Sequence, residues 1–256
     1  GRNNGEAVSN STDRSAVQVD TTRPVLANIT MVSGTNPAGL ADTLVLEFAA
    51  SEPLSTALVA IENRAAQSAR CDDARTLCNA SYTVSGEDAD GPIVFTVDYT
   101  DAAGNPGETG RSITHGVPVE IDLTAPTLTG VGIVATTQPA SVSSRISLFF
   151  NSSERLDVAG IAVSLAGAPA LVACDERALV CNATLTVEAE TREGHVAFTI
   201  AFRDIAQNQG AVVRTATDGS TVDVDVEPPT LVSVTMSSLQ TAPVGLGQQL
   251  TVRFIA

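Results

Sequence analysis

A stretch with two cysteines occurs twice in this sequence and sets the period of the whole chain. The first copy runs from Cys71 to Ser81 and the second from Cys174 to Thr184, so each cysteine recurs after 103 residues. In both copies six residues separate the cysteines, and an N-x-[ST] sequon begins directly after the second one. Self-similarity at a fixed period is the sequence signature of repeated structural units. We therefore expect consecutive copies of one unit.

Junction sequences keep the same period. Three segments share an aspartate followed four residues later by proline and six residues later by leucine, and their aspartates are Asp20, Asp122 and Asp225. The turn sequences that begin at Asn3, Asn105 and Asn208 also align. The repeat boundaries that follow are 1–19 for the end of an upstream repeat, 20–121 and 122–224 for two complete repeats, and 225–256 for the start of a further repeat. The chain is therefore expected to be a window on a longer tandem array.

Each unit is expected to be built of strands. Short β-branched runs with partial alternation are separated by Gly, Pro, Asn, Asp and Ser, which is typical of strands and turns. The expected strands are 24–32, 43–48, 57–61, 81–85, 93–99 and 117–121, then 127–134, 146–150, 161–165, 184–187, 196–202 and 222–224. About seven short strands in about 100 residues indicate an all-β fold of tandem immunoglobulin-like sandwiches. A helical period is not sustained, and Leu58–Arg70 is the stretch that could hold one helical turn.

Three motifs together resemble a known family. They are a D-x-T-x-P-x-L opening, an F-x-x-S-E-x-L strand end and the closing sequence Y-T-D-A-A-G-N-P-G at Tyr99–Gly107. Their combination resembles the bacterial-type Ig-like repeats of large surface and adhesin proteins, over nearly the whole chain. The resemblance implies a fold and does not imply an activity. The second closing sequence, Arg203–Asn208, lacks the glycine before asparagine, so its turn is expected to differ in detail.

A narrower resemblance rests on composition. Cysteine is scarce in the bacterial repeats, whereas this chain has cysteine loops, sequons and 14 basic residues that are all arginine. In these respects it resembles the giant Ig-repeat glycoproteins of algal surfaces, such as the mastigoneme (flagellar hair) proteins of green algae. That resemblance implies an extracellular structural glycoprotein.

The four cysteines permit three pairings. We favour Cys71 with Cys78 and Cys174 with Cys181, which closes two loops of eight residues. Each disulfide then stabilises its folded repeat by about 2–3 kcal/mol. The crossed pairings would join equivalent positions of different repeats. Zinc pairs usually have two to four intervening residues, and a redox pair needs a C-x-x-C motif, so neither site is expected. Disulfides and sequons indicate a secreted or cell-surface protein.

Five sequons are candidate glycosylation sites. They begin at Asn10, Asn28, Asn79, Asn151 and Asn182. Asn79 and Asn182 occupy the same position of the repeat, so in a eukaryotic host we expect glycans there, on solvent-facing edges. The other three are explained equally well by the frequency of Ser and Thr in strands, and in a bacterial host all five would be inert.

Acidic residues exceed basic ones by 29 to 14, which gives a net charge of −15. This charge disfavours nucleic acid and anionic lipid as partners and attracts cations. Two interpretations of the junction aspartates remain open: calcium ligands that stiffen a junction, or ordinary turn residues. The aspartates are Asp20, Asp122 and Asp225, with Glu52, Asp101, Glu154 and Asp204 as possible co-ligands. Asp101 and Asp204 are expected to cap the turns toward Asn105 and Asn208.

Catalytic signatures do not stand out in the sequence. His115 and His195 do not correspond between repeats, which favours solvated loop residues, and a G-x-S-x-G elbow is missing. No apolar run approaches the ~18–20 residues of a membrane span. We therefore expect no enzyme and no cofactor, apart from the calcium alternative.

The expected role is a structural repeat segment of a large secreted glycoprotein that forms or coats an extracellular filament. Its expected partners are neighbouring Ig-like repeats and other copies or components of the assembly. A second hypothesis is an adhesin or carbohydrate-binding module, for which an aromatic platform is typical. The chain has no Trp and only Tyr82 and Tyr99, both in expected strands. A third hypothesis is that the repeats are spacers that tether an enzyme.

Overall fold

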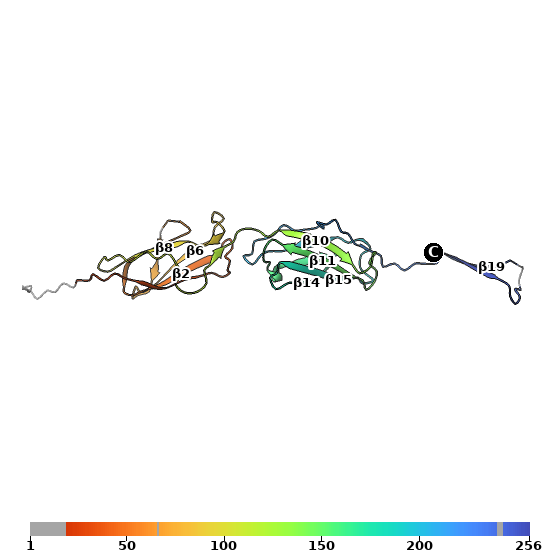
Figure 1. Ribbon diagram of the computed structural model, residues 1–256, viewed down its shortest axis with the longest axis horizontal. Coiled ribbons are helices and arrows are strands. Elements are labelled where there is room, and N and C mark those ends of the chain that lie inside the picture. Colours follow the sequence, from red (N-terminus) through yellow and green to blue (C-terminus); the bar gives the residue numbers. More distant parts are fainter. Residues whose placement is uncertain (1–18, 66, 240–242) are drawn as a thin grey trace, which may run out of the picture. The chain divides into compact units, whose positions relative to one another are not determined.

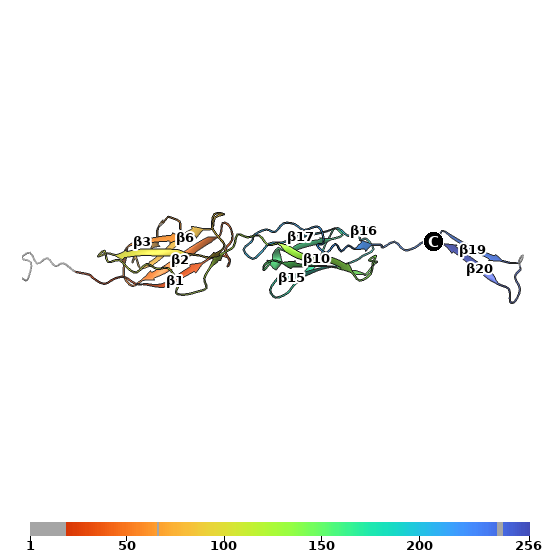
Figure 2. The same ribbon diagram turned by 45° about the horizontal axis from the view of Figure 1, so that its top comes forward.

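The computed structural model describes residues 19–65, 67–239 and 243–256 (Figures 1 and 2). The fold is all-β, with antiparallel sheets and one short 3-10 helix, Val158–Gly160, among the described residues. Contacts divide the chain into two compact units. The first contains the described residues up to Pro126 together with Arg203–Gly210, and the second contains Thr127–Phe202 and the described residues from Ala211 onward. The all-β prediction is confirmed, while the repeat boundaries stay predictions.

The first unit is a sandwich of two main sheets. One sheet has the order β1-β2-β6-β5, formed by Leu26–Val32, Thr43–Ala50, Leu77–Thr83 and Arg70–Cys71. The other has the order β4-β3-β8, formed by Gln67–Ser68, Leu54–Ile61 and Phe95–Asp101. A small third sheet pairs β7 (Gly91–Pro92) with β9 (Glu120–Ile121).

The core of the first unit follows from alternation along the strands. In β2, Leu44, Leu46 and Phe48 are buried, while the residues between them lie toward the outside. Because successive side chains of a strand point to opposite faces, one face of each sheet supplies the core. Val59 of β3 and Val97 of β8 join the same apolar cluster from the opposite sheet.

The second unit repeats this strand order. Its first sheet, β10-β11-β15-β14, is formed by Leu128–Ala135, Arg145–Ser152, Val180–Thr186 and Leu171–Cys174. Its second, β13-β12-β17, is formed by Ala168–Pro169, Ala162–Leu165 and Phe198–Ala201, and β16 (Gly194–His195) pairs with β18 (Asp223–Val224). Its core contains Ile146, Leu148 and Phe150 of β11, the counterparts of the buried β2 residues.

A two-stranded hairpin follows in the sequence. It pairs β19 (Ser233–Ser238) with β20 (Leu250–Ile255). Leu250, Val252 and Phe254 alternate as the buried residues of β2 and β11 do, yet they are 52 %, 51 % and 68 % exposed. The hairpin therefore has the sequence pattern of a sandwich strand pair without its covering sheet among the described residues.

Two sequence-based expectations need correction. The helical turn in Leu58–Arg70 is wrong, because Leu58–Ile61 completes β3 and a turn with positive φ at Glu62 and Asn63 leads into β4. Alternating burial in β3 explains the result, since Val59 and Ile61 point into the core. The strands expected at 81–85 and 184–187 begin earlier, at Leu77 and Val180, because pairing with the central strand continues past the second cysteine.

Replacing Leu46 by alanine tests the packing of the first unit. Its side chain is fully buried, so we expect the free energy of unfolding to fall by about 2–5 kcal/mol. Both tyrosines lie in this unit, so urea denaturation followed by tyrosine fluorescence reports its unfolding. Leu77→Ala is the control, because Leu77 is 60 % exposed and should change stability by less than about 0.5 kcal/mol. Equal losses for the two variants would contradict this core.

Candidate functional site

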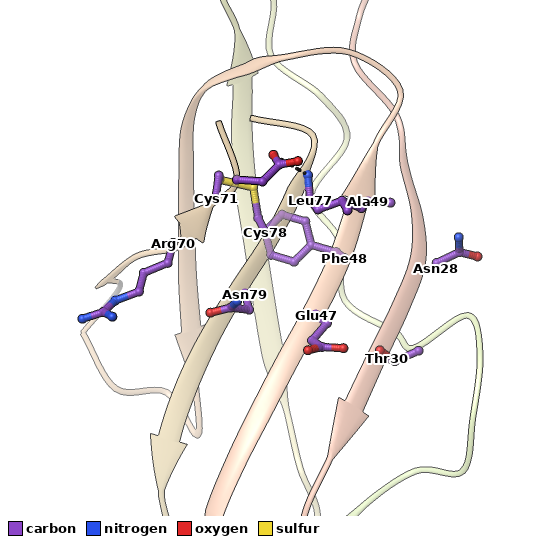
Figure 3. A pocket seen from close by; sticks show the side chains of 11 residues that line it. Asn28, Thr30, Glu47, Phe48, Ala49, Arg70, Cys71, Leu77, Cys78 and Asn79 are labelled. Atoms are coloured by element: carbon purple, nitrogen blue, oxygen red, sulfur yellow. Dashed lines mark hydrogen bonds between the residues drawn. A yellow bond between two sulfur atoms is a disulfide. The ribbon is translucent and has the colours of Figure 1, made fainter. Parts of the chain in front are cut away.

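The repeated cysteine stretch forms a disulfide-closed hairpin in each unit. Cys71 of β5 lies directly opposite Cys78 of β6, and the two are bonded with a Cα–Cα distance of 4.0 Å (Figure 3). Cys174 of β14 and Cys181 of β15 form the second disulfide in the same register, at 4.1 Å. The structure thus has the local pairing, and each disulfide joins an edge strand to its neighbour.

The residue after the first cysteine shapes the turn of each hairpin. In the first unit, Asp72 Oδ1 accepts hydrogen bonds from the backbone N–H groups of Thr76 at 2.9 Å and Leu77 at 3.1 Å. Arg75 adopts a positive φ of 57° within this turn. An aspartate that accepts from backbone amides favours such a turn. The aspartate that directly follows the first cysteine in both copies therefore has a local structural cause.

The second hairpin is built in the same way. Asp175 Oδ1 accepts from the N–H groups of Leu179 at 2.8 Å and Val180 at 3.2 Å, and Ala178 has a φ of 53°. The bonds from Val180 and then Leu179 hold the pKa of Asp175 below its usual value, because they stabilise the charged carboxylate. The turn chemistry is therefore shared by both copies.

The sequon asparagines of the described residues lie at the surface. Asn79 and Asn182 are exposed between buried neighbours on β6 and β15, so their side chains leave the outer sheet face. Asn28, at the bulge of β1, and Asn151, on β11, are exposed as well. Asn10 lies outside the described residues. Attachment of glycans stays a prediction.

An open groove of about 600 Å³ lies over the disulfide face of the first unit (Figure 3). Thr30, Glu47, Asn79 and Arg70 form a polar row across β1, β2, β6 and β5, because each lies opposite the next in the strand register. Asn28 lines the same groove. A glycan on either asparagine would therefore begin in this groove.

Three carboxylates converge in the first unit. Asp20, Glu52 and Asp101 each place an oxygen within 4.8 Å of the others. Asp101 is buried at the end of β8, where it accepts from the backbone N–H of Asn105 at Oδ1 and from its Nδ2 at Oδ2, both at 2.8 Å. Asn105 Nδ2 also donates to the backbone oxygen of Asp20 at 3.2 Å. The expected cap by Asp101 is confirmed.

The pKa values of Glu52 and Asp101 are shifted in opposite directions. Partial burial, then Asp20 and Asp101, raises the pKa of Glu52. Burial alone would raise the pKa of Asp101 too, but the hydrogen bonds from Asn105, together with those from the Ala103 and Gly104 backbone, outweigh it and lower that pKa. Carboxylate oxygens are the ligands that calcium and magnesium prefer, so the donor set fits a hard divalent cation. A cation there would relieve the repulsion among the three carboxylates.

The second closing turn repeats these bonds. Asn208 donates from its backbone N–H to Asp204 Oδ1 at 2.9 Å and from Nδ2 to Asp204 Oδ2 at 3.0 Å, which confirms the second cap. Its Nδ2 also donates to the backbone oxygen of Asp122 at 2.9 Å. The expectation of a different turn is wrong, because Gln207 adopts a φ of 72° where Gly104 has 89°. The asparagine bonds hold the turn without glycine. Glu154 is the counterpart of Glu52 in the S-E-x-L motif.

The junction aspartates also behave as turn residues. Oδ1 of Asp20, Asp122 and Asp225 accepts from the backbone N–H two residues later, at 2.9, 3.1 and 3.3 Å. These bonds agree with the turn interpretation in all three copies, while the calcium interpretation stays a prediction. In the described part of the chain, Asp225 belongs to no group of carboxylates like that of Asp20.

The two histidines lie apart from these sites. His115 is exposed, as expected. His195 is also exposed but belongs to β16 rather than to a loop, with its Nδ1 3.5 Å from Asp223 Oδ1 of the paired strand. β18 coincides with the strand expected at 222–224, whereas β16 has only two residues and lies just before the strand expected at 196–202.

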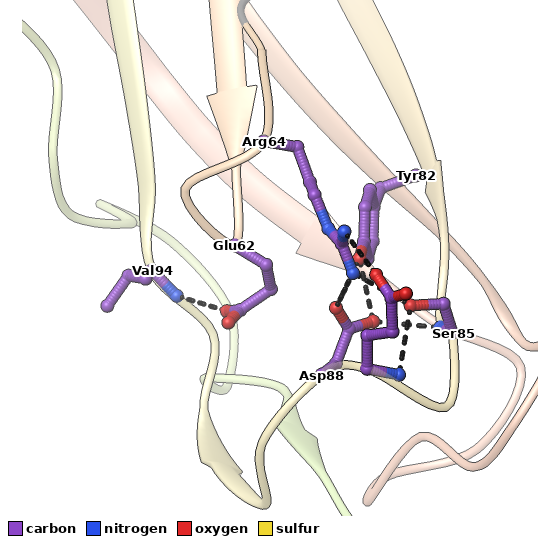
Figure 4. A network of polar contacts seen from close by, with 7 residues as sticks. Glu62, Arg64, Tyr82, Ser85, Asp88 and Val94 are labelled. Carbon is purple, nitrogen blue, oxygen red and sulfur yellow. Dashed lines mark hydrogen bonds and ion pairs between the residues drawn. The ribbon is translucent and has the colours of Figure 1, made fainter.

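A polar network around Arg64 was not expected from the sequence (Figure 4). The Arg64 guanidinium donates to Glu87 at 3.0 Å, and to Asp88 and Ser85 at 2.9 Å each. The Tyr82 hydroxyl donates to Asp88 at 2.6 Å. Burial would raise the pKa of Asp88, but the bonds from Ser85, Tyr82 and Arg64 lower it. Its members lie in separate segments, and of its charged residues only Glu87 recurs in the second repeat, as Glu190, so periodicity gave no signal.

Comparisons with known proteins do not identify a family, since the sequence matches no protein-family model and no curated protein. Among the described residues, no helix has the length and apolar character needed to span a membrane.

Removing one disulfide tests its structural role. We expect Cys71→Ala/Cys78→Ala to lower the free energy of unfolding of the first unit by about 2–3 kcal/mol, because the eight-residue loop becomes open in the unfolded chain. Urea denaturation followed by tyrosine fluorescence measures the loss. Proteolysis without reduction, followed by mass spectrometry, is the companion measurement. A peptide linking Cys71 to Cys174, or free thiols, would contradict local pairing.

The raised pKa of Glu52 predicts a pH-dependent stability difference. The ionised form is disfavoured in the folded state, so stability is gained as the pH falls through the folded pKa of Glu52. In the presence of a chelator, Glu52→Gln should therefore unfold at a higher temperature than the wild type at pH 7. The difference should shrink as the pH is lowered through this pKa. Glu120→Gln, at an exposed carboxylate outside the cluster, is the matched control for the substitution itself.

Added calcium separates the two interpretations of the cluster in the same experiment. A melting temperature that rises for the wild type but not for Glu52→Gln indicates cation binding by the carboxylates. Unchanged melting temperatures for both proteins indicate turn residues without a cation. A Glu52→Gln variant less stable than the wild type in chelator at pH 7 would contradict the repulsion.

Proposed function

We propose that this chain is a structural repeat segment of a large secreted glycoprotein that forms or coats an extracellular filament, such as a flagellar hair, a coat or a cell-surface fibre. The observation that carries the proposal is the duplication of one architecture. Both units have the same strand order, and each has its own core and its own disulfide hairpin with an adjacent sequon. In tandem arrays, length grows by repetition of such units.

The disulfides support an extracellular location. Each sandwich is small and lacks tryptophan, so a cross-link between an edge strand and its neighbour adds stability that a modest core does not supply. Disulfides persist in oxidising compartments and are rare in the cytosol. The resemblance of the repeats to surface and adhesin proteins, and to algal mastigoneme glycoproteins, agrees with this location.

The surface chemistry favours partners of the same kind. Asn79 and Asn182 lie on the outer faces of corresponding sheets, and glycans there would keep those faces open to solvent. Packing against neighbouring Ig-like repeats or other copies would then use the remaining surfaces. The net charge of −15 disfavours nucleic acid and anionic membranes as partners.

The carbohydrate-binding alternative receives less support from the tyrosines. Recognition of sugars commonly uses an exposed aromatic face, yet Tyr99 is 5 % exposed within the core. Tyr82 is half-buried and its hydroxyl is engaged by Asp88. The groove on the disulfide face combines Glu47 and Arg70 with apolar residues such as Leu77, has no tyrosine in its lining, and contains two sequon asparagines. We therefore place adhesion second.

Imaging of the native assembly tests the proposal. Antibodies raised against this chain, used as labels in electron microscopy, should mark a fibre or coat at regular axial intervals. Domain-sized density should then run along the fibre in the labelled regions. Labelling of isolated flexible strings would contradict the proposal, as would tight, saturable binding of a glycan by the purified chain or turnover of a substrate.

A further inference from the structure

The second unit has an acidic pocket that the proposed function does not use. It measures about 430 Å³ and lies between the β12–β13 turn and the loop that follows β15. Its lining includes Ala166 and Ala168, half-buried Leu185, and the exposed Glu188 and Glu190. Both carboxylates lie outside the ion pairs of the described residues.

The first unit shows what fills the equivalent place. The backbone N–H of Glu62 donates to Val94 at 2.9 Å, and that of Ala166 donates to Ala197 at 2.9 Å, so the two turns start from the same anchor. Two residues later stand Arg64 in the first unit and Ala168 in the second.

The loops after β6 and β15 are equivalent too. In the first, the N–H of Ser85 donates to Asp88 Oδ2 at 2.8 Å, and in the second, the N–H of Glu188 donates to Thr191 Oγ1 at 2.8 Å. Glu190 lies 103 residues after Glu87, which binds Arg64 at 3.0 Å. The second unit thus keeps the loop and one of the carboxylates that hold a guanidinium in the first (Figure 4).

Two differences between corresponding residues leave this place unfilled in the second unit. Ala168 stands where Arg64 crosses the first unit, and Leu185 stands where Tyr82 donates to Asp88. The second unit therefore lacks this guanidinium and the phenol, and Glu188 in place of Ser85 offsets the change from Asp88 to Thr191, so its pocket keeps two carboxylates.

We propose that this pocket binds an arginine side chain of a partner protein. Its guanidinium would lie between Glu188 and Glu190, as that of Arg64 lies against Glu87 and Asp88, and its aliphatic stem would cover Leu185. Arginine fits better than lysine because its planar group donates to two carboxylates at once, while its stem packs on apolar surface. Arg192 at the rim supplies a like charge, so the site is weak in isolation.

Nuclear magnetic resonance of the full ¹⁵N-labelled chain, titrated with N-acetyl-arginine amide, tests the site. We expect saturable shifts of the amide signals of Leu185, Thr186 and Thr191. Glu190→Gln should weaken binding about threefold, as expected for loss of one exposed ion pair. N-acetyl-lysine amide is the control ligand and should bind more weakly than the arginine amide. Equal binding of both amides, or no saturable shift at these residues, would overturn the proposal.

A variant of the first unit supplies a matched control. Arg64→Ala removes the side chain that occupies the equivalent place, so a second set of saturable shifts should appear at Tyr82, Ser85 and Asp88. The wild type should show none there, and the remaining signals report that the variant is folded. Failure of Arg64→Ala to gain this second site would count against the equivalence of the two pockets. The outcome is independent of the filament proposal, which concerns assembly and not this pocket.

Discussion

The register of the central strand in each sandwich is the constraint on which the rest of the structure depends. β2 pairs with β1 on one side and with β6 on the other, so its inner residues set the core and its outer residues set the surface row. A slip of one residue would turn Leu46 outward and Glu47 inward. The disulfide opposes such a slip, because Phe48 of β2 pairs with Cys78 and Cys78 is bonded to Cys71. The same relation holds for Phe150 and Cys181 in the second unit.

The two units share what the fold needs and differ in what solvent or a partner would contact. The disulfide hairpin and its capping aspartate recur in both units, and the turns at Asn105 and Asn208 recur one sequence period apart with nearly the same hydrogen bonds. Surface positions diverge, as with Arg64 and Ala168. In a repeat protein, conserved internal features maintain the unit, while divergence between copies gives each its own contacts. The proposed structural role and the proposed arginine site are therefore compatible, and each rests on separate residues.

Periodicity predicted the features that repeat. The strands around Leu46 and Leu148, and the caps by Asp101 and Asp204, follow from local pattern and from alignment of the copies. The stretch Leu58–Arg70 was misread because a short apolar run does not distinguish a buried strand from a helix, and only pairing with β8 decides between them.

The sequence alone does not show which distant side chains come together in the fold. Asp20, Glu52 and Asp101 meet although they are far apart along the chain, and the fold alone brings them within 4.8 Å. Arg64 lies in the segment between β3 and β4, which is longer than the β12–β13 turn of the second unit, and its partners lie in the loop after β6. Neither arrangement has a spacing rule that could be read from one sequence. The acidic pocket likewise depends on the fold, which brings the β12–β13 turn next to the loop after β15.

Hydrogen exchange along the whole chain tests the central claim, which is that one sandwich of about 100 residues recurs with its own core. Amides of β2 and β6 should exchange slowly, those of β11 and β15 should show the same protection about one period later, and those of the exposed hairpin β19–β20 should exchange fast. Protection that does not repeat with the sequence period would contradict the account. So would a hairpin protected as strongly as β10 and β11.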